Sequence, residues 1–187
     1  MNEKQFIIDV FTNYNNLLFN DQIIDNIIKV KQLLIKQNKK GNKIMFAGNG
    51  ASASIASHCA LDFTKQAGIR SICFNDSAFI TALANDYGYE KWLEKAISFH
   101  GKSGDIAILI SSSGSSQNIV HAAEYAINNN IHVITFSGFD QNNPLNQLGD
   151  IKFWVNTKAY NIIENMHQIW LLIICDLIIG KTQYSVS

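Results

Sequence analysis

Apolar residues recur at helical spacing over the first 37 residues of the chain. The recurring positions are Phe6, Ile7, Val10 and Phe11, then Ile23, Ile24, Ile27 and Ile28, and later Leu33 and Leu34. Apolar residues three and four positions apart lie on one face of an α-helix. The pattern therefore predicts two amphipathic helices between residues 3 and 37.

From Lys43 onward, short apolar runs alternate with stretches of helical periodicity. The apolar runs are 44–47, 71–74, 79–83, 106–110, 132–136 and 151–155, helical stretches begin at Ser52, Gln117 and Asn161, and 142–148 is a polar turn region. The only proline, Pro144, lies in that turn region, so no proline interrupts a predicted helix. This alternation predicts an α/β fold: a single, doubly wound parallel sheet flanked by helices.

The size and apolar content of the chain favour one well-buried domain. The chain has 187 residues, of which 47% are hydrophobic and 16% charged, which is too short for two ordinary domains. We therefore expect residues 1–187 to form a single domain.

The most apolar stretch, 169–175, continues as 177–179 after Asp176. It is too short for a membrane span and is interrupted by a carboxylate, so it predicts a buried helix at a subunit contact.

Charge and cysteine usage limit the possible partners. Fifteen Lys and Arg balance fifteen Asp and Glu without a basic block, so we expect no direct binding of nucleic acid and no membrane partner. Cys59, Cys73 and Cys175 are widely separated and show no paired metal-site spacing, which favours buried free thiols in a reducing compartment. The polar segment 1–5 lacks the features of a secretory signal. A cytoplasmic location follows.

The segment 111–116, Ser-Ser-Ser-Gly-Ser-Ser, carries the clearest functional signal. It follows the apolar run 106–110 and precedes the helical stretch 117–128. Hydroxyl groups and free backbone N–H groups at a helix start, together with the helix dipole, bind anions. The segment has neither the lysine of a P-loop nor a Gly-x-Gly-x-x-Gly spacing. A monophosphate therefore fits better than a nucleotide.

A second strand-to-helix junction, at 43–54, repeats this arrangement. There the run 44–47 leads into Gly48-Asn49-Gly50-Ala51-Ser52. Ligands of open parallel sheets bind beyond the carboxyl ends of the strands, where both hydroxyl-rich loops fall. The two loops together predict a small phosphorylated ligand.

Three motifs, in this order, resemble the sugar isomerase (SIS) domain. They are Asn49-Gly50-Ala51-Ser52-Ala53, Asn85-Asp86-Tyr87-Gly88-Tyr89 and Ser111-Ser112-Ser113-Gly114-Ser115-Ser116. Within that family the chain looks most like the phosphoheptose isomerases, over essentially its whole length. The resemblance implies a flavodoxin-like sheet and a homotetramer in which an amino-terminal helical segment, 1–40, packs on the core and on neighbouring subunits.

The resemblance also implies a set of substrate-binding residues. The family's sugar-phosphate positions correspond to Ser52, Ser111, Ser112, Ser113 and Ser116, and positions that contact the sugar correspond to Asn49 and Asp86. One departure is the pair Gly50-Ala51, where the family usually has two glycines. We expect the extra methyl group to narrow the loop slightly.

His58 and Asp62 are four residues apart and share one face of the helix that begins near Ser52. From the residues alone, the pair could bind a divalent metal or a hydroxyl-bearing substrate, or form only an ion pair. The resemblance implies a zinc-binding His at position 58 and an acid/base Glu at position 62. Here the second residue is the shorter Asp62, which is our candidate catalytic base.

The helix 161–179 departs further from the resemblance. Glu164 stands where the family usually has Gln, and Leu172 replaces a His that is thought to complete the metal site and transfer a proton. His58, Asp62 and Glu164 could still form a three-ligand site for zinc or another divalent ion, with an open water position. His167 is a candidate neutral proton donor in catalysis, or else packs within the oligomer.

Two functions follow from these residues. The first is a phosphosugar isomerase of phosphoheptose isomerase type, which interconverts aldose and ketose forms of sedoheptulose 7-phosphate or a related sugar phosphate through an enediol. The alternative is a non-catalytic SIS module, either a phosphosugar binder or a DiaA-like protein-interaction scaffold. Leu172 favours the alternative. His58, Asp62, Asp86 and the intact serine loop favour the enzyme.

Overall fold

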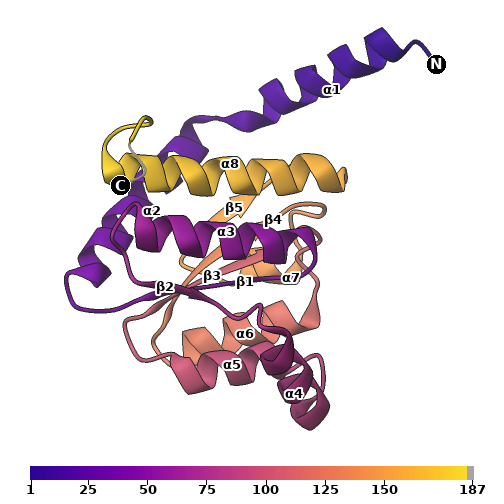
Figure 1. The fold of residues 1–187 in the computed structure, drawn as a ribbon. Helices are drawn as coiled ribbons and strands as arrows, with labels where there is room; N and C mark the ends of the chain where they lie inside the picture. Colours follow the sequence, from indigo (N-terminus) through magenta and orange to yellow (C-terminus); the bar gives the residue numbers. More distant parts are fainter. Residues whose placement is uncertain (185–187) are drawn as a thin grey trace.

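The computed structural model describes residues 1–184, which contain a five-stranded parallel sheet in the order β2-β1-β3-β4-β5 (Figure 1). The strands are β1 (Ile44–Gly48), β2 (Ser71–Cys73), β3 (Ile106–Ser111), β4 (His132–Ser137) and β5 (Ile151–Trp154). Every neighbouring pair of strands is parallel. The predicted doubly wound α/β fold is confirmed, and its strand order is the flavodoxin-like one.

Helices cover both faces of this sheet. They are α1 (Glu3–Leu18), α2 (Asp21–Asn38), α3 (Ala51–Lys65), α4 (Ser77–Tyr87), α5 (Trp92–His100), α6 (Gln117–Asn128), α7 (Pro144–Gln147) and α8 (Tyr160–Ile179). Helices α2, α3 and α8 lie on one face, and α5 and α6 lie on the other (Figure 1). The two helices predicted within residues 3–37 are therefore present, and the second ends one residue later.

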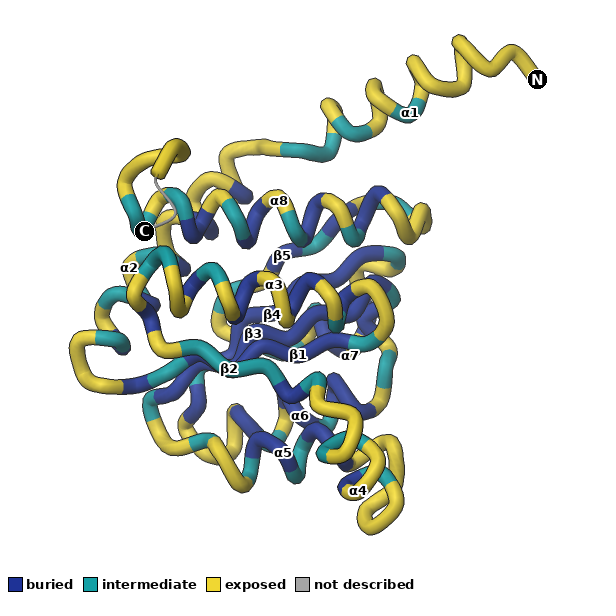
Figure 2. The backbone as a smooth tube through the Cα atoms, viewed as in Figure 1, coloured by how far each residue is buried: buried dark blue, intermediate teal, exposed yellow. Residues whose placement is uncertain are grey.

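The strands are buried on both faces because their side chains alternate between two apolar layers. In β1, Ile44 and Phe46 pack with α2, α3 and α8, whereas Met45 and Ala47 pack with α5 and α6. Figure 2 shows β1, β3 and β4 as the buried centre of the molecule. Central parallel strands therefore read as continuous apolar runs, which is why the sequence identifies them.

The apolar run 79–83 is not a strand. It lies inside helix α4, which begins after Asp76, whose carboxylate accepts a hydrogen bond from the Phe79 N–H at 2.8 Å. This cap satisfies an otherwise unpaired N–H group of the first turn. A short apolar run does not by itself distinguish a strand from a helix. Helix α5 follows at Trp92–His100, where the apolar pattern predicted no element.

The turn region 142–148 contains the short helix α7. Pro144 is its first residue, and the Asn143 side chain caps it by accepting a hydrogen bond from the Asn146 N–H at 2.8 Å. Proline is tolerated at this position because its missing N–H would have no partner within the helix.

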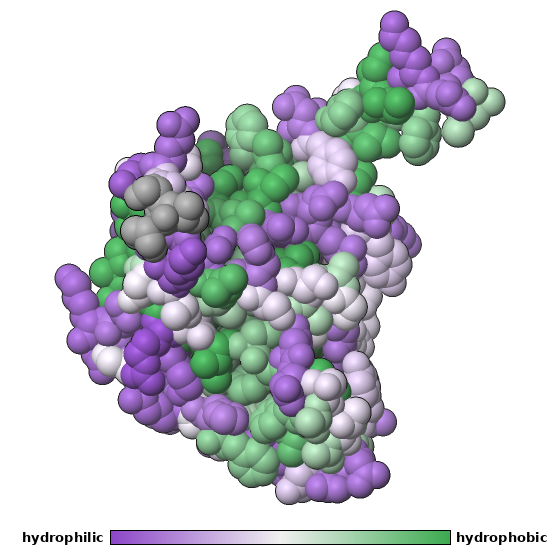
Figure 3. Space-filling view, viewed as in Figure 1, coloured by the Kyte–Doolittle hydropathy of each residue, from purple (hydrophilic) through white to green (hydrophobic). Residues whose placement is uncertain are grey.

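Helix α1 extends away from the sheet layers and has no buried residue (Figures 1 and 2). Only its end contacts the body: Asn165 donates a hydrogen bond to the Tyr14 hydroxyl at 2.7 Å, and the Trp170 indole donates to the Leu18 carbonyl at 2.7 Å. The space-filling view shows apolar side chains along the projecting helix (Figure 3). Phe6, Ile7, Ile8 and Phe11 are all exposed.

Helix α8 is long and apolar enough to cross a membrane by length and composition alone. In the structure it instead packs against α2, α3 and β4, and Ile163, Met166 and Ile174 are buried in that contact. This confirms that the predicted helix is buried on one side, and its place at a subunit contact stays a prediction. Ile173 and Leu177 stay exposed on its outer side.

Cys59 and Cys175 are buried free thiols, as predicted, whereas Cys73 is only half-buried. Burial, with a smaller effect of the nearby Asp62 carboxylate, raises the pKa of Cys59 and of Cys175 to about 12. Both therefore stay protonated at neutral pH and behave as apolar packing groups.

Candidate phosphate-binding site

The two hydroxyl-rich loops meet because β1 and β3 are neighbours in the sheet. Gly48 at the end of β1 is in register with Ile110 near the end of β3. The chain leaves β1 for α3 on one face and leaves β3 for α6 on the other. Such a topological switch point opens a crevice beyond the strand ends, where ligands of this fold class bind.

A cavity of about 150 Å³ lies at this point. It is lined by Asn49, Ser52, Ile110, Ser111, Ser112, Ser113, Ser116, Tyr160 and Glu164. The structure thus brings together six of the seven predicted substrate-binding residues. Asp86 is the exception: it is exposed at the end of α4, where its carboxylate accepts a hydrogen bond from the Asn85 amide at 2.9 Å.

The first loop needs glycine at two positions. A Cβ atom at Gly48 would lie 2.6 Å from the backbone of Ser52, so glycine there allows α3 to start directly against β1. Gly50 has φ +56° and precedes the first residue of α3, and no side chain caps that helix. Its first N–H groups therefore have no side-chain cap within the described residues. Ala51 is exposed and does not line the cavity, so its methyl group does not narrow the site as we expected.

The second loop is held by its own hydroxyl groups. The Ser111 hydroxyl donates to the Ser116 hydroxyl at 3.2 Å, and the Ser115 N–H donates to the Ser113 hydroxyl at 3.3 Å. Ser116 precedes helix α6 and makes no side-chain cap to it. The helix N-terminus thus keeps N–H groups for an anion.

Two side chains that were not predicted as site residues, Asn118 and Tyr89, hold Asn49 in place. Its amide exchanges two hydrogen bonds, of 3.0 and 2.9 Å, with the buried amide of Asn118, and its oxygen also accepts a bond from the Tyr89 hydroxyl at 3.3 Å. Tyr89 belongs to the motif in which we selected Asp86. Asn118 has no local signal because its partner lies 69 residues away.

Helix α8 supplies the third wall of the cavity through Tyr160 and Glu164. The Ser112 hydroxyl lies 3.4 Å from one carboxylate oxygen of Glu164 and donates to it. Glu164 is the only charged side chain among the lining residues. We predicted Glu164 as a metal ligand and did not predict Tyr160.

His58 and Asp62 lie elsewhere on α3 and do not line this cavity. The His58 Nε2 atom is 3.3 Å from an Asp62 carboxylate oxygen, and the two side chains are 49% and 21% exposed. Ser52 and Asp62 are ten residues apart, which corresponds to about 15 Å along a helix axis. Within one chain, the pair is therefore an ion pair or hydrogen bond at the surface.

The predicted three-ligand metal site does not form within the described chain. Residues 1–184 contain no group of three or more His, Cys, Asp or Glu side chains that could hold a metal ion. The physical reason is placement: Glu164 faces the serine loop, whereas His58 and Asp62 contact each other. Leu172 packs against the core between the sheet and α8. The donor set of a single chain therefore does not fit zinc.

His167 is a core residue, which corrects its predicted catalytic role. Its side chain is fully buried, its Nε2 atom lies 3.1 Å from the Ser137 carbonyl, and its ring contacts Phe136 edge-on. Burial is the larger effect and lowers the pKa of His167 to about 4. The hydrogen bond to Ser137 raises this pKa and offsets only part of the decrease. The imidazole is neutral, as expected, but it is separated from the cavity.

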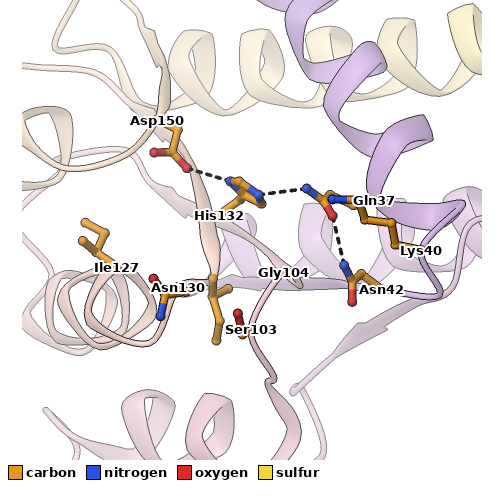
Figure 4. Close-up of a pocket in the computed structure, with 10 residues that line it drawn as sticks. Gln37, Lys40, Asn42, Ser103, Gly104, Ile127, Asn130, His132 and Asp150 are labelled. Carbon is orange, nitrogen blue, oxygen red and sulfur yellow. Dashed lines mark hydrogen bonds and ion pairs between the residues drawn. The ribbon is translucent and has the colours of Figure 1, made fainter.

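A larger cavity of about 560 Å³ lies at the opposite edge of the sheet (Figure 4). There His132 joins Asp150 at 3.3 Å and Gln37 at 2.9 Å, and Gln37 accepts a bond from Asn42 at 3.0 Å. These contacts satisfy buried amides and tie the end of α2 to the start of β4. This edge carries the amino ends of the strands, so the smaller cavity is the better candidate despite its size.

Residues 14–138 match the model of the SIS domain. The chain belongs to the SIS domain family. Among curated proteins, the phosphoheptose isomerase of Thermodesulfovibrio yellowstonii is 35% identical over 83% of this chain and 80% of its own length. The DnaA initiator-associating protein DiaA of Klebsiella pneumoniae is 31% identical over 82% of this chain and 83% of its own length.

Solved SIS structures superpose along nearly the whole chain. A phosphoheptose isomerase from Francisella tularensis matches with a TM-score of 0.83 and 26% identity, over 97% of this chain and all of the other. The phosphoheptose isomerase of Neisseria gonorrhoeae matches with a TM-score of 0.82 and 25% identity, over 94% and 98%. Both matches cover a larger share of the chain than residues 14–138, so the similarity of fold extends beyond that range.

Proposed function

We propose that this SIS domain is a phosphosugar isomerase of phosphoheptose isomerase type. The observation that carries the proposal is the cavity at the β1/β3 switch point, where Ser52, Ser113 and Ser116 gather beside two uncapped helix N-termini. Hydroxyl and N–H donors at such a point suit a phosphate group. The relatives named phosphoheptose isomerase supply the reaction class.

The reaction moves a proton between two neighbouring carbons of the sugar phosphate. Binding the phosphate in a cavity of about 150 Å³ leaves the sugar to extend outward past Asn49 and Glu164. Asn49 lines the cavity and is held in place by Asn118 and Tyr89, so its amide is fixed where a bound sugar would contact it. Fixed donors of this kind stabilise charge that develops on a substrate oxygen.

A second function, a DiaA-like protein-interaction scaffold, is favoured by Leu172 and by the 31% identity to the Klebsiella pneumoniae protein. Leucine can neither transfer a proton nor bind a metal. In this alternative the serine loop, 111–116, binds a sugar phosphate without converting it, or no longer binds a ligand. The two functions differ in whether the protein exchanges a substrate proton.

We further propose that the protein works as a homotetramer in the cytoplasm. Helix α1 exposes Phe6, Ile7 and Phe11, and α8 exposes Ile173 and Leu177. Clustered exposed apolar side chains of this kind mark surfaces that another protein surface covers. A second copy of the same chain, presenting the same helices, would bury both.

The test of the isomerase is proton exchange. Purified protein is incubated with sedoheptulose 7-phosphate in deuterated water, with and without added divalent metal, and the sugar protons are followed by NMR. Deuterium entering beside the carbonyl, with or without aldose product, supports the isomerase. No exchange under either condition, with binding shown by line broadening, contradicts isomerisation of this sugar and favours the scaffold or sensor.

A further inference from the structure

Asn49 lies in the loop between β1 and α3, where its side-chain amide bonds to a second amide in both directions. The Asn49 Nδ2 atom donates to the Asn118 Oδ1 atom at 3.0 Å, and the Asn118 Nδ2 atom donates to the Asn49 Oδ1 atom at 2.9 Å. The Tyr89 hydroxyl donates to the same Asn49 oxygen at 3.3 Å. Three hydrogen bonds therefore converge on one side chain that lines the phosphate cavity.

These contacts occupy all but one of the hydrogen-bonding groups of the Asn49 side chain. A carboxamide has two N–H donors and two acceptor lone pairs. The Asn49 oxygen already accepts from Asn118 and Tyr89, and one N–H already donates to Asn118. Among residues 1–184, no acceptor bonds to the second N–H. Toward a ligand, the Asn49 side chain can therefore only donate.

An asparagine without such a partner has no fixed polarity. Its terminal torsion is broad and roughly two-fold, so a free carboxamide can present either its oxygen or its nitrogen. Rotation of the Asn49 amide alone would place nitrogen against nitrogen and oxygen against oxygen in the pair with Asn118. Asn118 thus decides which atom of Asn49 a ligand meets.

Asn118 belongs to a rigid part of the molecule. It is the second residue of α6, is 2% exposed and does not line the cavity. The neighbouring residues Ile119 and Ala122 of the same helix are fully buried in the apolar layer that contains Leu109 of β3. Both amides belong to one chain, so their pairing does not depend on what a neighbouring subunit adds to the cavity.

We propose that Asn118 is a positioning residue that holds Asn49 as a hydrogen-bond donor to a sugar oxygen of the ligand, an inference that rests on the sugar-phosphate binding proposed above. The phosphate has the hydroxyl groups of the serine loop and two helix N-termini as donors, and the sugar extends past Asn49. A carbonyl or hydroxyl oxygen of the sugar accepts the remaining N–H. The amide pair therefore selects the sugar part of the ligand rather than its phosphate.

Calorimetry on the full chain separates these two parts of the ligand, with sedoheptulose 7-phosphate and inorganic phosphate as the probes. Asn118→Leu keeps approximately the shape of the side chain and removes both hydrogen bonds to Asn49. We expect the Kd of the sugar phosphate to rise by about fivefold to tenfold, because Asn49 can then turn its oxygen toward the sugar. The Kd of inorganic phosphate should not change. A residue that only builds the cavity would raise both values.

Two further variants support this comparison. Tyr89→Phe removes the third bond to Asn49 at a side chain that is 57% exposed, so the fold is not at risk. It should raise the Kd of the sugar phosphate by about twofold to threefold. Asn128→Leu, at the exposed end of the same helix, is the matched control and should bind both probes as the wild type does.

NMR tests the direction of the hydrogen bond. In the 15N-labelled wild type, one of the two Nδ2 protons of Asn49 should shift downfield when sedoheptulose 7-phosphate binds, whereas inorganic phosphate should not cause this shift. The signal is assigned by its loss in Asn49→Ser. Binding of the sugar phosphate without this shift would overturn the proposal.

An unchanged Kd of the sugar phosphate in Asn118→Leu would also overturn it, as would an equal rise in both Kd values with the fold intact by circular dichroism. If Asn118→Leu does not fold, Tyr89→Phe decides the question, and wild-type Kd values in that variant overturn the proposal. A wild type that exchanges no substrate proton, while the variants show the expected Kd pattern, would refute the isomerase and support the role of Asn118.

Discussion

The buried His167 should make the protein less stable in mild acid. In the folded chain, burial lowers the pKa of this imidazole from 6.5 to about 4, and its buried Nδ1 atom has no hydrogen-bond partner among residues 1–184. The unfolded chain therefore binds a proton on this histidine at pH values where the folded chain does not. Because the unfolded state binds more protons in that window, stability rises with pH between about 4 and 6.5.

The size of the effect follows from the two pKa values. Below pH 4, protonation of this histidine in the unfolded chain lowers the free energy of unfolding by about 3 kcal/mol. More than half of this decrease occurs above pH 5: between pH 7 and pH 5 the free energy of unfolding is expected to fall by about 2 kcal/mol. Such a loss is a large part of the stability of a typical domain. Paired or hydrogen-bonded carboxylates add their own pH dependence, so the contribution of His167 must be isolated by a variant.

Urea unfolding of wild type and His167→Gln, at pH 7 and pH 5 and at one fixed protein concentration, measures this contribution. The glutamine amide can still donate to the Ser137 carbonyl but does not titrate. We expect the decrease in free energy of unfolding between pH 7 and pH 5 to be smaller by about 2 kcal/mol in the variant than in the wild type. This difference does not depend on the stability of the variant at pH 7. His100→Gln, at an exposed position, is the control. Equal losses in wild type and His167→Gln would refute the idea that burial holds this imidazole neutral.

Three further outcomes test the site and the assembly. Gly48→Ala places a methyl group 2.6 Å from the Ser52 backbone, so we expect about 1–3 kcal/mol of destabilisation and weaker phosphate binding, measured by thermal unfolding and calorimetry. Ser113→Leu should abolish calorimetric binding of sugar phosphate by filling the cavity, whereas Ser115→Leu, outside the cavity lining, should retain it; retained binding in Ser113→Leu would contradict the phosphate assignment. Phe11→Ser, at a side chain 68% exposed on α1, should lower the mass measured by light scattering if α1 forms a subunit contact, and an unchanged tetramer would place that contact elsewhere.

The sequence by itself determined most of the fold. Strands β1, β3 and β4 are buried on both faces, so each appears as a mainly apolar run, although β4 contains the buried Thr135. Helix α6 agrees with its predicted range of 117–128. The prediction failed at 79–83, because a helix and a strand of that length have the same apolar composition, and the Asp76 carboxylate that caps helix α4 lies outside the run.

The sequence also located the phosphate loops, because hydroxyl residues that follow an apolar run carry a local signal. It could not determine which side chains share the cavity with them. Tyr160 and Glu164 reach the loop from a helix about 50 residues downstream, and Asn118 reaches Asn49 across the sheet edge. Such contacts depend on the order of the strands and the rotation of α8, which are set by packing of the whole core rather than by neighbouring residues. For the same reason, only the tertiary structure buried His167 in the core and brought Glu164 rather than Asp62 to the phosphate cavity.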